Sequence, residues 1–514
     1  MKSIAKTVGI VMFIMILSKV LSLVSTLLYT TILGNVSETN IYSYAVSIPN
    51  IIFTIFGTAL STVVIPIFSD NIEKGNIKKA FKFTDNVISL SLVVTVFLTV
   101  VGMIISPFIP LLTSFKTGNY DFTVFAIRIM LPIMIFYALN YVFQGILQSL
   151  GKFNMPAFVS VPSALIVIGY LIFFIDKFGV TGLLVATFIG LSTQTLILVP
   201  SILKTGYRYK PSFNCKNEDV KKAIKLMLPV MAGTSAYQIN LFFNLTFAAN
   251  FEGTVNIFRV VQELVSNSVL IFIYSLTAVL FPKFSMLVAK GDINEVKENL
   301  IKVIKIILYI LLPATIGFIL VRNELMSLLV GWGKITQEDV IFAGTLLALY
   351  ALGITGLGIK EVVDRVFYSL KDTKRPAVIG VVVMGINIGV SLLLSRFIGA
   401  FGIPLGNSVS TLASAMVLLI LLRRKIGALG MRNIIKFVLK ILFACVIMVG
   451  VVISISLLIN NFTFGFLLMD RIIKLFVPVL SGVVVYVTST CFLKVEETTD
   501  VLNKVKLKLL PHNK

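Results

Sequence analysis

The sequence has very little of the residues that build metal, redox or histidine-based catalytic sites. Its 514 residues include 3 cysteines, 1 histidine and 1 tryptophan. Cys215, Cys445 and Cys491 lie far apart in the chain, and His512 lies near its end. This scarcity argues against a zinc site, a disulfide framework and histidine catalysis. No phosphate-binding GxxxxGK loop occurs either, which agrees with a protein that works without ATP. We also expect no cofactor and no enzymatic activity.

Charged residues are also scarce, at 13% of the chain, whereas 57% of the residues are hydrophobic and the mean hydropathy is +0.99. A soluble globule could not cover such a composition with polar surface. Apolar runs of about 20 residues recur, and each is long enough to cross about 30 Å of hydrocarbon as a helix. Fourteen such runs are centred near residues 20, 55, 97, 135, 166, 191, 236, 268, 311, 353, 387, 412, 447 and 482. The expected fold class is therefore an all-α polytopic membrane protein.

Acidic residues are the rarer charge, since 23 Asp and Glu stand against 45 Lys and Arg, a net charge of +22. The basic residues cluster in alternate loops, which predicts that those loops and both termini are cytoplasmic. Anionic lipid headgroups account for this charge, so we expect no nucleic-acid partner. The apolar run after MKSIAK continues past Lys19 to Leu33, which predicts a retained first helix rather than a signal peptide. Residues 495–514 read as a basic cytoplasmic tail lying on the inner membrane surface.

Two pairs of segments repeat along the chain. LSTVVIPIFSDNIEKG (60–75) matches LTAVLFPKFSMLVAKG (276–291) at a shift of 216 residues. FQGILQSLGKFNMP (143–156) matches VDRVFYSLKDTKRP (363–376) at a shift of 220, and Gly179 matches Gly399 at that same shift. Chance similarity between apolar helices is the alternative explanation. Two pairs with nearly equal shifts favour a true internal repeat.

A repeat of six helices predicts two lobes with the same orientation in the membrane, related by an axis along the membrane normal. We expect an N-lobe over 1–205, a C-lobe over 206–428 and two additional helices over 429–494. Parallel repeats of this kind are typical of transporters, in which rocking of the lobes opens a central cleft to alternate sides.

Several of these segments carry a family resemblance. SKVLSL, LGNVSETNIYSYAVSIPN, ALSTVVIPIFSD, VDRVFYSLKDTKRP, NIGVSLLLSRFIGAFGIPLGNSVS and LLRRKIG together resemble the MurJ (MviN) lipid II flippases of the multidrug/oligosaccharidyl-lipid/polysaccharide exporter superfamily. The resemblance covers nearly the whole chain and is most specific from Val363 to Gly427. It implies fourteen helices, a two-lobed core, and a groove for a polyprenyl tail formed by the last two helices.

Four basic residues, Lys19, Arg259, Lys360 and Arg365, fall within predicted membrane helices, where each needs a partner, water or an anionic ligand. Lys19 has no acid within one turn and is the main candidate substrate contact, with a snorkelling or structurally paired lysine as the alternative. Arg259 and Glu263 are four residues apart and can share a helix face, either as an ion pair or as ligand contacts. Lys360, Glu361, Asp364 and Arg365 form a candidate gating or structural charge cluster.

The resemblance also assigns polar positions. Lys19 matches a basic family position, whereas Ser25 and Thr26 replace an Arg-Asp pair, and Asn40 replaces an acid in the loop after the first helix. Asn50, in the Pro-Asn pair of the second helix, is a further candidate for lining the cleft. At the positions of the acidic sodium ligands of some members stand Phe243 and Ser391, which leaves Asn387 as the one sodium candidate.

These observations favour a flippase that moves lipid II, the undecaprenyl-pyrophosphate-linked peptidoglycan precursor, from the inner to the outer leaflet by alternating access. A flippase for another lipid-linked saccharide and a drug/cation antiporter are the alternatives. A polytopic glycosyltransferase is disfavoured because the longest outer loop, near Val330 to Asp339, is too short to house its chemistry. We expect a monomer in the bacterial cytoplasmic membrane whose partners are the lipid-linked saccharide, membrane lipids and cell-wall synthases.

Overall fold

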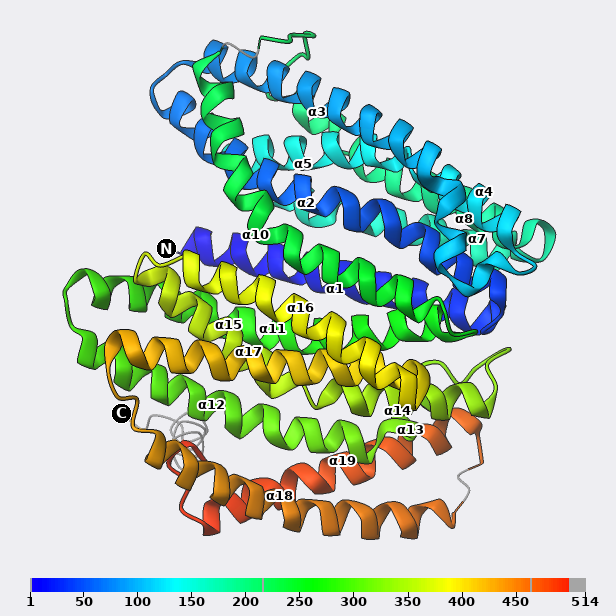
Figure 1. Cartoon of the computed structure of the whole chain (residues 1–514), viewed down its shortest axis with the longest axis vertical. Coiled ribbons are helices and arrows are strands. Elements are labelled where there is room, and N and C mark those ends of the chain that lie inside the picture. The colour runs from blue at the N-terminus through cyan, green and yellow to red at the C-terminus, as the bar shows by residue number, and fades with distance from the viewer. Residues whose placement is uncertain (1, 215–216, 463–464, 499–514) are drawn as a thin grey trace. The chain divides into compact units, whose positions relative to one another are not determined.

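The computed structural model describes residues 2–214, 217–462 and 465–498, and within these ranges the chain is helical with no strand (Figure 1). Cys215, His512 and the tail from residue 499 lie outside the described residues. The chain divides into two compact units, Met1–Ile257 (unit 1) and Phe258–Lys514 (unit 2).

Unit 1 contains ten α-helices and three short 3-10 helices among its described residues. They are α1 (Lys2–Leu33), α2 (Ser37–Glu73), α3 (Ile77–Ile105), η1 (Ser106–Phe108), η2 (Pro110–Leu112), η3 (Ser114–Lys116), α4 (Tyr120–Met130), α5 (Ile133–Ser149), α6 (Asn154–Phe158), α7 (Ser160–Phe173), α8 (Ile175–Leu196), α9 (Val199–Leu203) and α10 (Glu218–Ala248).

The helix α11 (Thr254–Ala289) begins in unit 1 and continues into unit 2. The other described helices of unit 2 are α12 (Ile293–Leu320), α13 (Arg322–Leu329), α14 (Gln337–Ala351), α15 (Ile354–Ser369), α16 (Lys374–Ile398), η4 (Gly399–Phe401), α17 (Gly402–Ile426), α18 (Met431–Asn460) and α19 (Leu467–Phe492).

The predicted apolar runs all fall on these helices. Every predicted centre lies within a helix, except the centre near residue 353, which lies between α14 and α15. Helices form here because a backbone in hydrocarbon has no water to bond and must satisfy its N–H and C=O groups internally. Among the described residues, eleven segments are long and apolar enough to cross a membrane, and five of these hold two α-helices, such as Lys374–Ile426 with α16 and α17. The all-α polytopic fold class is confirmed, and the number fourteen stays a prediction.

Residues paired by the sequence repeat end their helices in the same way. Gly75 after α2 and Gly291 after α11 have φ values of 74° and 77°. In both turns the next residue donates its N–H five residues back, from Asn76 to the Asn71 carbonyl at 2.9 Å and from Asp292 to the Leu287 carbonyl at 3.1 Å. This is the helix-ending geometry that glycine favours, because a residue without Cβ adopts positive φ at little cost.

The second pair of repeated segments also shares a backbone conformation. Gly151 after α5 and Lys371 after α15 have φ values of 71° and 56°, and Gly179 and Gly399 have φ values of 57° and 60°. Lys371 therefore adopts the left-handed conformation that glycine provides in the first copy, although a side chain makes this conformation less favourable.

The apolar core of unit 1 is organised around α2. One buried cluster includes Tyr44 and Phe53 of α2, and a second includes Phe68 of α2 with Phe83 of α3 and Val220 of α10. The helix α10 packs on α2 and so lies in unit 1. The predicted lobe bounds, 1–205 and 206–428, refer to the sequence repeat rather than to these compact units, and they stay a prediction.

Candidate functional site

Lys19 lies on α1 in the stretch of residues 13–20, where most side chains are exposed. Its neighbour Ser18 is 5% exposed and donates its hydroxyl to the Ala157 carbonyl of α6 at 3.1 Å, so this face of α1 is held against the protein. Lys19 is exposed and makes no salt bridge among the described residues. An ammonium group without a salt bridge to the described part of the chain, in a segment long enough to span the membrane, calls for water or an anionic ligand.

The other candidates in unit 1 differ in accessibility. Ser25 and Thr26 are 9% and 5% exposed. The Thr26 hydroxyl donates to the Ser22 carbonyl of its own helix at 3.1 Å, as buried hydroxyls on membrane helices often do. Asn50 is exposed on α2, which runs unbroken through Pro49. Of these three polar residues, Asn50 is the one placed to contact a ligand without rearrangement.

In unit 2, Arg259 and Glu263 lie one turn apart on α11, and both are half-buried. Next to them, Phe258 packs edge-on against Tyr350 of α14 with ring centroids 5.5 Å apart. The spacing puts both charged residues on one face of a helix that is fixed by this aromatic contact.

The charge cluster of α15 is held by short contacts. Lys360 Nζ lies 2.8 Å from Asp364 Oδ2 and 3.5 Å from Glu361 Oε1. Asp364 is 7% exposed, and its Oδ1 has no hydrogen-bond partner among the described residues. Arg365 follows on the same helix and is half-buried. Lys360 thus has two carboxylate partners, whereas Lys19 has none among the residues that the structure describes.

Asn387 of α16 is fully buried, and neither polar atom of its side-chain amide has a partner among the described residues. The Ser391 hydroxyl, one turn later, is also buried and without a partner, and Gly406 of α17 packs closely against it. Amide and hydroxyl oxygens are suitable ligands for a hard cation. Within the described residues no group of three or more His, Cys, Asp or Glu side chains could hold a metal.

Asp372 joins the turn after α15 to the end of α17. Its carboxylate lies 2.6 Å from Lys425 Nζ and 3.4 Å from Arg375 Nη1. The hydrogen bond from Lys425 is the largest cause that holds the pKa of Asp372 below its usual value. The stabilisation is therefore present above the usual pKa of about 3.9 and is lost only as the pH falls through the lower folded-state value. Between about pH 5 and 8 this contact stays ionised.

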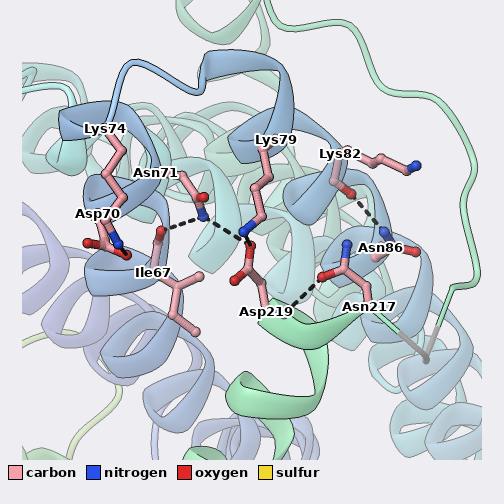
Figure 2. Close-up of polar contacts among 9 residues, drawn as sticks. All are labelled: Ile67, Asp70, Asn71, Lys74, Lys79, Lys82, Asn86, Asn217 and Asp219. Atoms are coloured by element: carbon pink, nitrogen blue, oxygen red, sulfur yellow. Dashed lines mark hydrogen bonds and ion pairs between the residues drawn. The ribbon is translucent and has the colours of Figure 1, made fainter.

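The start of α10 is anchored to the α2–α3 turn, as Figure 2 shows. Asn71 donates its amide to Asp219 Oδ2 at 3.2 Å, and Lys79 Nζ lies 3.3 Å from the same oxygen. Asn217 caps α10 by accepting the Asp219 N–H at 2.9 Å. The Asp219 carboxylate therefore ties the first turn of α10 to the turn that the sequence repeat marks.

The segment between α9 and α10 is also tied to α3. Asp85 Oδ1 accepts the Tyr207 hydroxyl at 2.7 Å and the Lys210 N–H at 3.0 Å. Asn86 Oδ1 accepts the Asn214 N–H at 2.7 Å. Burial and the hydrogen bond to Asp85 raise the pKa of Tyr207, so its hydroxyl stays a donor. Residues 207–214 are therefore held against α3.

At the opposite ends of α2 and α10, a buried polar network holds the start of α11. Asn40 Oδ1 accepts the Asn256 N–H at 2.8 Å. Asn256 Oδ1 in turn accepts the hydroxyls of Ser43 at 3.1 Å and Thr30 at 3.3 Å. Asn40 and Asn256 are 1% and 0% exposed. The sequence interpretation missed Asn256, although the repeat shift of 216 residues pairs it with Asn40.

The sequence interpretation also missed Arg128, which belongs with the basic residues inside membrane segments. It lies on α4, in the spanning segment Tyr120–Ser149. Arg128 is therefore a further basic residue in a candidate spanning segment, beyond the four named from the sequence. The signal was present as a single arginine in the apolar run VFAIRIMLPIM.

Comparison with known proteins shows the family to which this chain is related. The family model described as "Lipid II flippase MurJ" matches residues 29–472. The chain belongs to the MurJ family. A protein of Rickettsia prowazekii named "Probable lipid II flippase MurJ" is 25% identical over 495 residues, which are 95% of this chain and 97% of that protein. One of Bdellovibrio bacteriovorus with the same name is 26% identical over 461 residues, 87% of each chain.

Solved structures agree on the fold of this MurJ family member. A lipid II flippase MurJ in an inward closed conformation superposes with a TM-score of 0.79 at 21% identity, covering 94% of this chain and 98% of that one. An inward-facing multidrug transporter of the MATE family and MOP superfamily superposes with a TM-score of 0.67 at 17% identity, covering 80% and 95%. The fold is thus shared with both transporters, and the family match distinguishes MurJ.

Proposed function

We propose that this chain transports lipid II from the inner to the outer leaflet of the bacterial cytoplasmic membrane. The observation that carries the proposal is the MurJ family match over residues 29–472. The activity is transport by alternating access, with no covalent change to the substrate. The polar headgroup would face a barrier of tens of kcal/mol in hydrocarbon, because each unsatisfied polar group costs several kcal/mol and each charge more.

The two basic candidates act on the pyrophosphate. We propose that Lys19 of α1 and Arg259 of α11 each bind it during the cycle, while Glu263 sets the local charge of α11 and Asn50 donates to the sugar or the phosphate. The α15 cluster, in which Lys360 is already paired, has the structural or gating role. Asn387, with its unpartnered amide, is the position that supports sodium coupling.

The membrane potential supplies a driving force on this scheme. With both termini and the basic loops in the cytoplasm, the two negative charges of the pyrophosphate move outward across a membrane whose inner side is at negative potential. That movement gains about 4.6 kcal/mol per 100 mV, since each charge contributes about 2.3 kcal/mol. The chain would then act as a monomer without ATP, next to the synthases that use the product.

An apolar groove in unit 2 supports a site for the polyprenyl tail. Its cavity of about 550 Å³ is lined by α12, α13, α18 and α19, including Tyr309, Phe318, Phe476 and Tyr486. The Tyr486 hydroxyl donates to the Tyr309 carbonyl at 2.7 Å, which joins α19 to α12 along the groove. We propose that residues 429–494, with α12 and α13, hold the tail while the headgroup crosses.

The proposed function is tested by complementation. The resident lipid II flippase of a bacterial cell is depleted, this chain is expressed, and lipid II arriving in the outer leaflet is measured. We expect restored outer-leaflet lipid II. The replacement of the family's Arg-Asp pair by Ser25 and Thr26 favours one alternative, a flippase for another lipid-linked saccharide. Failure of a well-expressed, correctly inserted chain to rescue would favour that alternative.

The groove makes a separate prediction for Gly317, which lines it on α12. A Cβ at this position would meet no atom within 4 Å, so leucine fits the backbone and fills the groove. We expect Gly317→Leu to lower transport about 15-fold, because the leucine takes space that the tail would occupy and the tail then loses the burial of about two CH2 groups, about 1.6 kcal/mol. The matched control is Gly450→Leu on α18, an exposed glycine with equally open space that does not line the groove. Equal transport by the two variants would exclude the groove as a tail site.

A further inference from the structure

A second cavity lies within unit 1, at the end of α3 opposite to the lysine-rich α2–α3 turn. It has a volume of about 480 Å³ and is formed by α4 and the 3-10 turn η1 that follows α3. Polar side chains in its wall are Tyr120, Asp121 and Arg128, and the rest of the wall is apolar. The Tyr120 hydroxyl donates to the Pro107 carbonyl at 3.0 Å, so α4 and η1 are joined at this cavity.

Arg128 is held in place but keeps most of its hydrogen-bonding capacity. Its Nε donates to the Ser106 hydroxyl at 3.0 Å. This is its one hydrogen bond within the described part of the chain, and no carboxylate there forms a salt bridge with it. A guanidinium carries five N–H donors, so the two terminal nitrogens keep four for a ligand. Arginine in this state is suited to bidentate binding of a phosphate.

Asp121 supplies the opposite charge at the other end of the same cavity. It precedes Arg128 by seven residues, about two turns, which separates their Cα atoms by about 10 Å along α4. Asp121 is exposed and forms no salt bridge among the residues that the structure describes. Because α4 starts at Tyr120, Asp121 lies near the helix end and Arg128 lies deeper in the spanning segment.

This order of charges matches a zwitterionic phospholipid. In such a lipid the ammonium group is outermost, the phosphate lies below it, and the acyl chains continue into the hydrocarbon. The apolar wall of the cavity includes Phe125, which is 44% exposed. A free phosphate ion would use only Arg128 and would be repelled by Asp121.

We propose that this cavity binds the headgroup of a phosphoethanolamine phospholipid, with the phosphate at Arg128 and the primary ammonium at Asp121. This site goes beyond the transport function and does not depend on which substrate is carried. It assigns a role to the one intramembrane arginine of α4.

The test is native mass spectrometry of the purified full-length chain titrated with dioleoyl lipids that carry phosphoethanolamine, phosphoglycerol or phosphocholine headgroups. We expect one phosphoethanolamine lipid to bind in preference to the other two. Arg128→Gln should weaken its binding about tenfold or more, which corresponds to a lost charge-assisted contact of about 1.5–3 kcal/mol. The affinity of Arg128→Lys should lie between those of the wild type and Arg128→Gln, because a lysine keeps the charge but loses the bidentate geometry.

Asp121→Asn gives an independent test, because its expected effect on affinity has opposite signs for the zwitterionic and the anionic lipid. It should weaken the phosphoethanolamine lipid and strengthen the phosphoglycerol lipid, since the repulsive carboxylate is gone. The matched control is Arg396→Gln, an exposed arginine in the last turn of α16 that should leave all three affinities unchanged. The proposal is overturned if Arg128→Gln binds the lipids as the wild type does, or if Asp121→Asn leaves the headgroup preference unaltered. If Arg128→Gln does not fold, the headgroup preference of Asp121→Asn tests the proposal.

Discussion

Outer-leaflet lipid II is expected to fall to background when Lys19→Ala replaces the wild-type chain in cells depleted of their own flippase. Lys19 is exposed on α1 with no salt bridge among the described residues, so its charge is available to a pyrophosphate. Placing an unpaired lysine in the centre of a membrane helix costs about 2.5–3.5 kcal/mol, which makes a lysine without a function unfavourable there. Loss of its contact with the headgroup, worth about 1.5–3 kcal/mol, lowers binding about 10- to 150-fold.

Membrane abundance has to be equal for this comparison, so each variant is quantified in the membrane fraction. Lys19→Arg keeps the positive charge and should retain much of the transport. Lys116→Ala, which changes an exposed lysine in η3, should transport as the wild type does. Undiminished transport by Lys19→Ala would remove Lys19 from the substrate site, and the proposed role of Arg259 would then have to be tested alone.

The second large effect is expected at Asn40, where alanine should release the start of α11. Asn40 Oδ1 accepts the Asn256 N–H at 2.8 Å inside a fully buried network. Removing the acceptor leaves that N–H buried and unsatisfied, at a cost of about 1–3 kcal/mol. The opening equilibrium of this segment should shift by about 5- to 150-fold. Hydrogen exchange of the amides from Gly253 to Ile257, measured by mass spectrometry in nanodiscs, should accelerate by the same factor.

Two further substitutions serve as a control and as a conservative comparison for Asn40→Ala. Ser47→Ala is the matched control, because the Ser47 hydroxyl bonds only the Ser43 carbonyl of its own helix, at 2.7 Å, among the described residues. Asn40→Asp keeps the acceptor but loses the NH2 group that donates to the Val36 carbonyl at 2.8 Å. Exchange should therefore accelerate less than in Asn40→Ala, because only the Asn256 N–H keeps its partner. Exchange in Asn40→Ala that equals the wild type would show that Asn40 does not hold α11.

The Asn40 network connects to transport because α11 is the helix that passes from unit 1 to unit 2. Its residues Thr254 to Ile257 belong to unit 1, and Arg259 follows two positions later in unit 2. Release of the start of α11 therefore changes the support of a proposed pyrophosphate ligand. If the network stabilises one state of the cycle, Asn40→Ala will alter transport as well as exchange.

The sequence by itself determined the fold class, the family and the position of the helices that hold thirteen of the fourteen predicted centres. Apolar runs long enough to span hydrocarbon have few structural alternatives, because only a helix satisfies their backbone internally. It also marked the special backbone positions, since Gly75 and Gly291, like Gly179 and Gly399, share positive φ values. Lys19 and the α15 cluster were found for a similar reason, because a charge in an apolar run is conspicuous.

The tertiary structure alone decided which polar groups meet. Asn40 and Asn256 are 216 residues apart, and the Arg128 cavity needs Ser106 from another helix. The apolar groove combines α12 and α13 with α18 and α19. Sequence periodicity could not find these contacts because, in a membrane protein, both the lipid-facing and the core-facing sides of a helix are apolar, so the pattern does not reveal which face packs. Burial of Ser25 and Thr26, and exposure of Asn50, follow from packing for the same reason.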